Sequence, residues 1–211
     1  MLFTTSQIYA LRKLKSFTYF PSEYRRWKKR NFSAPLPATL KRNFLLSRGI
    51  DGASWIETGT YKGETAFYLS KSSKHVISIE PDLKLFSAAK KRLSGTENVT
   101  ILLGKSEEVF LDAIELVDKD VNFFLDGHFS GGETFQADLP TPLQFELETI
   151  SRVIHKFEKV VVVIDDVRLC RHNVFEESGY PSLDFLVNWA QSNSMSWFIE
   201  NDMFVAERKS A

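Results

Sequence analysis

The chain has 211 residues, enough for one ample core, and its 43% hydrophobic and 26% charged residues are typical of a globular protein. No apolar run approaches the roughly 20 residues that a membrane helix needs, and the N-terminus lacks the pattern of a signal peptide. The single cysteine, Cys170, excludes an internal disulfide, so we expect a cytoplasmic location.

The net charge of zero hides an uneven distribution. Residues 1–50 hold 11 of the 27 Lys and Arg residues but one of the 27 acids, Glu23. Two interpretations stay open. This part either docks as a basic helical flap on an acidic body, or it forms an arm for an anionic partner such as nucleic acid, phospholipid or acidic glycan. The densest stretch, 25–30, mixes Trp27 with basic residues.

The first 50 residues form a separate predicted unit. Residues 1–34 have helical, amphipathic pieces broken at Pro21, and 33–37 is a stiff linker with two prolines. A helix is expected over 38–50, ending at Gly49. We therefore divide the chain into a basic helical extension, 1–50, and a domain, 51–211.

From residue 54 onward, strand-length apolar runs alternate with segments of helical period. Strands are expected at 55–57, 75–80, 99–103, 121–125, 160–164, 195–200 and 203–208, and helices at 63–71, 82–93, from Ser106, from Thr141 to 157, and from Pro181. Asp82 and Ser106 are expected N-caps. The stretch Thr141-Pro142-Leu143-Gln144 is typical of a capping box.

This order predicts an α/β fold: a Rossmann-like, doubly wound, mostly parallel sheet of seven strands. Asn201 and Asp202, which tolerate positive φ, join the last two strands into a C-terminal antiparallel hairpin. Such sheets bind ligands beyond the carboxyl ends of their strands. Candidate site residues should therefore directly follow each strand.

The turn after the first strand has glycines at 59 and 63, which permit close approach of a ligand, and an acid at Glu57. A dinucleotide turn has the pattern G-x-G-x-x-G, whereas this turn has G-x-x-x-G. Its acid disfavours a pyrophosphate and suits a cationic ligand such as S-adenosylmethionine. A purely structural turn is the alternative.

Other strand ends complete this candidate cofactor site. Glu80, after the second strand, is placed to accept both ribose hydroxyls, unless it is only a solvated acid. Lys105 and Ser106 begin a helix whose amides would meet the adenine edge. The candidate cofactor-binding residues are Glu57, Gly59, Tyr61, Gly63, Thr65, Glu80, Lys105, Ser106 and Asp126.

Three aspartates follow the fourth and fifth strands: Asp126, Asp165 and Asp166. Converging carboxylates repel one another, so either one is protonated or a cation lies among them. Oxygen ligands suit Mg²⁺ or another divalent cation. Alternatively, Asp126 contacts the cofactor while Asp165 or Asp166 caps the next segment. His128 is the candidate general base, with Asp126 as its catalytic neighbour.

Across 54–208 the chain resembles the class I S-adenosylmethionine-dependent methyltransferases, in the turn at Glu57-Thr58-Gly59, the acid at Glu80, the segment 104–107 and the closing hairpin. In that family the seventh strand inserts antiparallel beside the fifth. Asp126, Asp165 and Asp166 also resemble the acids of cation-dependent O-methyltransferases. The first motif departs from the family by lacking its middle glycine, and residues 1–50 resemble nothing that we can name.

The resemblance implies methyl transfer to a hydroxyl of a small-molecule, sugar or glycan acceptor, with or without a metal. Three alternatives stay open: an NAD(P)-dependent oxidoreductase, a methyltransferase-fold binding or hydroxylase-like protein without methyl transfer, and nucleic-acid methylation guided by the basic arm. The last lacks the Asp/Asn-Pro-Pro-aromatic motif of many amino-methylating enzymes after the fourth strand. Whether the chain forms a homodimer also stays open.

Overall fold

The computed structural model describes residues 21–127, 141–170 and 179–208. It confirms the predicted sheet of seven strands, whose order is β3-β2-β1-β4-β5-β7-β6. The strands are β1 (Ser54–Thr58), β2 (Val76–Glu80), β3 (Val99–Leu103), β4 (Asp120–Leu125), β5 (Lys159–Ile164), β6 (Ser196–Glu200) and β7 (Met203–Arg208). Strands β1 to β5 run parallel, and β7 lies antiparallel between β5 and β6. The placement of β7 beside β5 confirms the arrangement that the resemblance implied.

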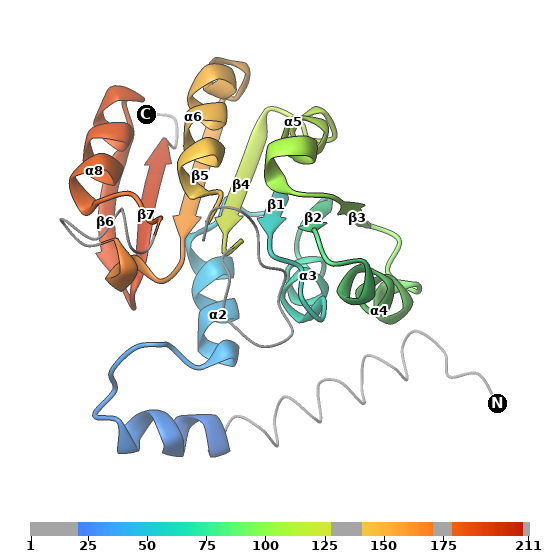
Figure 1. Ribbon diagram of the computed structural model, residues 1–211, viewed down its shortest axis with the longest axis vertical. Helices are drawn as coiled ribbons and strands as arrows, with labels where there is room; N and C mark the ends of the chain where they lie inside the picture. Colours follow the sequence, from blue (N-terminus) through green and yellow to red (C-terminus); the bar gives the residue numbers. More distant parts are fainter. Residues whose placement is uncertain (1–20, 128–140, 171–178, 209–211) are drawn as a thin grey trace.

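Helices cover both faces of the sheet (Figure 1). They are α2 (Ala38–Arg48), α3 (Glu64–Leu69), α4 (Leu83–Leu93), α5 (Ser106–Glu115), α6 (Leu143–Val153) and α8 (Leu183–Ser192), with short 3₁₀ turns at Ile154–Lys156 and Val167–Leu169. Residues of α5, α6 and α8 share one hydrophobic cluster, and residues of α2, α3 and α4 share the other. The sheet therefore separates two apolar cores, as a doubly wound fold requires.

The central strands bury side chains in both cores, and in β5 the run from Val160 to Ile164 is therefore apolar throughout rather than alternating. In β5, Val160, Val162 and Ile164 belong to the cluster with α5, α6 and α8. Val161 and Val163 belong to the opposite cluster. All five side chains are fully buried. Within the described parts of the chain, no helix has the length and apolarity needed to cross a membrane.

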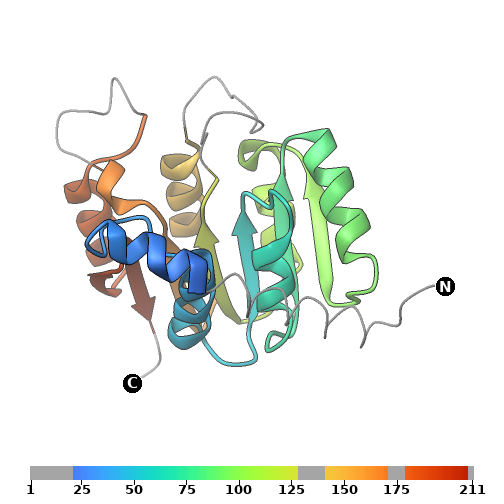
Figure 2. The same ribbon diagram turned by 90° about the horizontal axis from the view of Figure 1, so that it is seen from below.

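The carboxyl ends of β1, β4 and β5 meet at one edge of the sheet, the lower edge in Figure 1. Residues 21–29 are helical and lie on this same side. Figure 2 looks onto this edge and shows that helix in front of the sheet. The closing hairpin turns at Asn201 and Asp202, with φ of 54° and 67°, which confirms the predicted positive-φ turn.

Helix N-termini show both a confirmed prediction and two wrong ones. Asp82 caps α4 by accepting hydrogen bonds from the N–H groups of Lys84 and Leu85, as predicted. Ser106 is not the N-cap of α5: Lys105 holds that position and Ser106 is the first helical residue. No capping box forms at α6, which begins at Leu143, one residue later than expected. Its nearest equivalent is the Thr141 hydroxyl oxygen, which accepts a hydrogen bond from the Leu143 N–H.

Candidate functional site

The turn after β1 is held tightly against the end of β4. Gly59 has a φ of +85°, a conformation that L side chains rarely adopt. A Cβ atom at this position would lie 2.7 Å from the backbone oxygen of Asp126. The N–H groups of Gly59 and Thr60 both donate to the Ile79 carbonyl, each at 3.1 Å. The glycine is therefore required for this strand end to pass so close to its neighbour.

Glu57 lies buried beneath this turn, 1% exposed. The Ser78 hydroxyl donates to its Oε2 at 2.5 Å, and Thr60 Oγ1 lies 2.6 Å from the same hydroxyl. Burial raises the pKa of Glu57 to about 8, although the Ser78 hydrogen bond works in the opposite direction. At neutral pH this carboxyl group is mostly protonated, and a nearby cation would favour its ionised form.

Glu80 connects two of the turns at the carboxyl edge. Its Oε2 accepts the Tyr61 N–H at 2.7 Å, and its Oε1 accepts the Asp82 N–H at 3.0 Å. Burial raises its pKa, against the effect of these two hydrogen bonds. Both carboxylate oxygens are thus fixed in direction. This arrangement fits the predicted role of accepting hydrogen bonds from vicinal hydroxyl groups, because each oxygen has a second lone pair.

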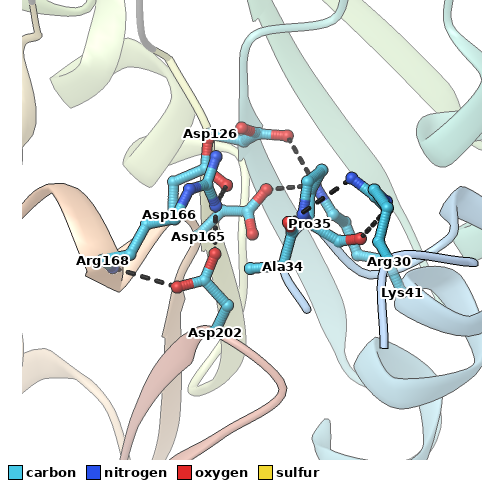
Figure 3. Close-up of polar contacts among 9 residues, drawn as sticks. All are labelled: Arg30, Ala34, Pro35, Lys41, Asp126, Asp165, Asp166, Arg168 and Asp202. Carbon is cyan, nitrogen blue, oxygen red and sulfur yellow. Dashed lines mark hydrogen bonds and ion pairs between the residues drawn. The ribbon is translucent and has the colours of Figure 1, made fainter. Parts of the chain in front are cut away.

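A lysine from the N-terminal part of the chain places a positive charge beside two of the three aspartates. Lys41 of α2 donates to Asp165, and its Nζ lies 3.8 Å from Asp126 (Figure 3). Burial alone would lower the pKa of Lys41, but Asp126 and Asp165 outweigh it and raise that pKa. Burial, followed by the charge of Asp126, raises the pKa of Asp165 to about 7.

The third aspartate has a different cation as its partner. Asp166 has a φ of +55° and accepts a hydrogen bond from Arg168 Nη1 at 2.5 Å. The same guanidinium nitrogen pairs with Asp202 of the hairpin turn (Figure 3). The three acids are therefore divided between Lys41 and Arg168. In the described ranges no group of three or more acidic, His or Cys side chains has the geometry of a metal site, so a divalent cation on Asp126, Asp165 and Asp166 is not supported.

A buried acid that our sequence analysis did not single out lies close by. Glu146 of α6 is 1% exposed, and its Oε1 accepts a hydrogen bond from the Ser106 hydroxyl at 2.6 Å. Together with Asp165, it lines a small pocket beyond the ends of β4 and β5. The remaining lining residues are Leu125, Gly127, Thr141, Leu143, Ile164 and Tyr180. The signal in the sequence was an acid on the face of α6 that also carries Leu143, Leu147 and Ile150.

Glu146 gives a testable pH dependence of stability. Burial raises its pKa from 4.5 to about 7, so the folded protein binds this proton more tightly than the unfolded chain. The contribution of this group to the free energy of unfolding is fully present below pH 4.5. It is lost as the pH rises through 7, by up to about 1.4 kcal/mol per pH unit. We therefore measure the free energy of unfolding by urea titration between pH 5 and 7.5 (~2.5 units). Over this range we expect it to fall less for Glu146→Gln than for the wild type. Identical pH slopes for the two proteins would contradict this.

The other predicted cofactor residues lie along the same edge. Gly63, with a φ of +69°, precedes α3, and Thr65 lies half-buried in its first turn. Tyr61 is 43% exposed. At α5, the backbone N–H of Lys105 donates to Glu108, while the Ser106 hydroxyl donates its proton to Glu146 and could only accept a hydrogen bond from a ligand. The predicted general base, His128, lies outside the described residues.

Known structures share this architecture. A putative rRNA methylase from Clostridium thermocellum is 11% identical, covers 83% of this chain and 97% of its own, and has a TM-score of 0.52. A putative methyltransferase from Streptococcus mutans, in complex with SAH, is 14% identical, covers 83% and 98%, and has a TM-score of 0.50. A precorrin-6y C5,15-methyltransferase from Geobacter metallireducens is 14% identical, covers 80% and 87%, and has a TM-score of 0.50. No protein-family model and no curated protein matches the chain.

The sheet order, the antiparallel β7 and these likenesses define the class. The chain has the fold of the class I S-adenosylmethionine-dependent methyltransferases. At identities of 11% to 14%, the likenesses establish architecture. The chemistry of the site has to be argued from its own residues.

Proposed function

We propose that this protein transfers a methyl group from S-adenosylmethionine to a hydroxyl group of a small-molecule or sugar acceptor. The observation that carries the proposal is the pair of buried carboxyl groups at the ends of β1 and β2, Glu57 and Glu80. They lie at the carboxyl edge of a methyltransferase sheet, on either side of a turn with positive-φ glycines. The three similar structures are those of a putative rRNA methylase and two methyltransferases, one of them putative, which agrees with this proposal.

The polarity of the side chains at this edge fits the donor. Glu80, oriented by two backbone N–H groups, would hold the ribose hydroxyls. Glu57 would ionise in the field of a ligand that carries an ammonium and a sulfonium group. Gly59, Tyr61, Gly63 and Thr65 would surround the donor, and the helix start at Lys105 and Ser106 would meet its adenine edge. A nicotinamide oxidoreductase is disfavoured, because the turn after β1 has the pattern G-x-x-x-G in place of the G-x-G-x-x-G of a dinucleotide turn.

The donor supplies an electrophilic methyl group. In the proposed reaction the acceptor oxygen forms a bond to the methyl carbon, the bond from that carbon to sulfur breaks, and the acceptor loses its hydroxyl proton. The protein mainly has to align the two reactants. The small pocket lined by Asp165 and Glu146 also includes Gly127, which follows Asp126, and it would take only the reacting hydroxyl end of the acceptor. We keep His128 as the proposed general base. Asp165, with a pKa of about 7, suits the same task.

Lys41 takes the role that the sequence had suggested for a metal ion. Its ammonium group is already paired with Asp126 and Asp165. A divalent cation on these carboxylates would first have to displace it, so we propose that transfer proceeds without a bound metal. Lys41 would hold Asp126 beside the donor and Asp165 at the pocket.

The test is the formation of S-adenosylhomocysteine by the full-length protein with methyl-labelled donor and a panel of sugar, nucleoside and phenolic hydroxyl acceptors. The proposal predicts label in one class of acceptor and an equal amount of S-adenosylhomocysteine. Donor binding without transfer to any acceptor would instead favour a binding protein on this fold. Reduction or oxidation of a nicotinamide cofactor would favour the oxidoreductase alternative.

A further inference from the structure

The basic residues of the N-terminal region fall into two groups in the structure. Those of α2 pair with acids of the domain: Lys41 with Asp165, Arg42 with Glu64, and Arg48 with Glu200. The flap interpretation of the charge asymmetry therefore holds for α2. It does not extend to the helical residues that precede α2.

The cations of the preceding helix point to solvent. Arg25, Arg26, Lys28 and Lys29 are exposed, and none of them forms an ion pair with any residue that the structure describes. Four positive charges within five residues repel one another, and an external anion would relieve this repulsion. In the described ranges no acidic side chain forms an ion pair that offsets its cost.

The helix that carries them is nevertheless fixed in place. Trp27 packs against the cluster of α2, α3 and α4. The Phe32 ring lies edge-on to the Trp27 ring, with the two ring centroids 4.9 Å apart. Thr39 donates both its N–H and its hydroxyl to Glu23, each at 3.4 Å. Arg30 donates to the Pro35 carbonyl at 2.9 Å, and Figure 3 shows this contact beside Lys41. The exposed cations are thus presented on a positioned element at the carboxyl edge.

Two aromatic rings lie among these cations. Tyr24 is 40% exposed and Phe32 is 48% exposed, with ring centroids 6.1 Å apart. Exposed aromatic rings beside basic side chains provide stacking faces for unpaired bases. A lipid surface fits less well, because insertion needs a continuous apolar helix face. In 21–29 the large apolar side chains are Tyr24 and Trp27, and Trp27 already packs on the domain.

We propose that the basic surface, defined as Tyr24, Arg25, Arg26, Lys28, Lys29 and Phe32, binds single-stranded nucleic acid. The four cations neutralise phosphates of the backbone, and the two rings stack on bases. Because the surface lies on the carboxyl-edge side, a bound strand runs past the mouth of the proposed site. The inference goes beyond the proposed function, since binding to this surface needs neither donor nor transfer.

The test is fluorescence anisotropy with the full-length protein and a labelled strand of about 12 uridines, in the absence of methyl donor and over a range of salt concentrations. Arg25→Glu/Arg26→Glu is expected to weaken binding about 10-fold or more. It should also reduce the slope of log affinity against log salt by roughly 1.4, because each phosphate contact contributes about 0.7. Tyr24→Ala is expected to weaken binding about 5-fold or more through loss of stacking.

The matched control is Lys74→Glu/Lys119→Glu, which makes the same charge change at the opposite edge of the sheet. These exposed lysines pair with Asp118 and Glu158 and precede β2 and β4. Unchanged binding by this control, with loss in the Arg25/Arg26 variant, supports the proposal. Equal binding by the two variants would overturn it. So would tighter binding to a duplex of the same length, or capture by phosphatidylserine vesicles without oligonucleotide binding.

Discussion

Replacing Lys41 with methionine is expected to lower kcat/KM about 100-fold. The change keeps most of the apolar stem of the side chain and removes the ammonium group that pairs with Asp126 and Asp165. Removing one partner of a buried ion pair typically destabilises a folded protein by about 3–5 kcal/mol, because the other partner is left buried without a compensating charge. Asp165 is 5% exposed, so it would become protonated at neutral pH. The acceptor pocket would then lose Asp165 as a proton acceptor, and Asp126 would lose its neighbouring cation.

The same variant tests whether Lys41 or a bound divalent cation supplies the positive charge beside Asp126 and Asp165. If Lys41 fills the place of a cation, the wild type keeps its activity in EDTA, and added Mg²⁺ restores part of the activity of Lys41→Met. Arg48→Met, on the same helix but paired with the half-exposed Glu200, is the control and should remain within a few-fold of wild type. Wild-type activity that disappears in EDTA and returns with Mg²⁺ would contradict the proposed role of Lys41.

Gly59→Ala is expected to weaken S-adenosylmethionine binding by about 50-fold or more. The added Cβ would lie 2.7 Å from the backbone oxygen of Asp126, and the φ of +85° adds strain of about 1–3 kcal/mol. The backbone has to move, since the clash is with another backbone atom. That movement displaces the turn after β1, whose residues are proposed to surround the donor.

A second glycine provides the matched control for this experiment. Gly52 also has a positive φ, +71°, but no atom lies within 4 Å of the Cβ that alanine would add. Gly52→Ala therefore reproduces the backbone strain without the clash. Calorimetric titration of both variants, with melting temperatures to confirm folding, isolates the effect on the site. Equal donor affinities for the two variants would contradict the placement of the site.

The strands of the sheet could be predicted from local patterns, because each strand is recognisable from the apolar residues within its own segment. A run such as 160–164, apolar on both faces, identifies a central strand without any knowledge of its neighbours. Periodicity does not give the order of the strands. The position of β7 beside β5 was implied by the family resemblance, and the ladder from Ile164–Phe204 to Val160–Arg208 confirms it.

The site was harder to predict because its decisive contacts are distant in sequence. Lys41 meets Asp165 across 124 positions, so nothing near the aspartates indicated that a lysine would supply their positive charge. The wrong N-cap at Ser106 has a related cause. Its hydroxyl is taken by Glu146, 40 residues later, and the local rule for caps does not include such a competitor.

The most direct measurement is calorimetric titration of the full-length protein at pH 7 with S-adenosylmethionine and, separately, with NADH, in two buffers of different ionisation enthalpy. We predict binding of S-adenosylmethionine with release of up to about one proton, because Glu57, whose pKa is about 8, ionises beside the cationic ligand. NADH should give no binding heat. Binding of NADH with no heat from S-adenosylmethionine would contradict the proposed function.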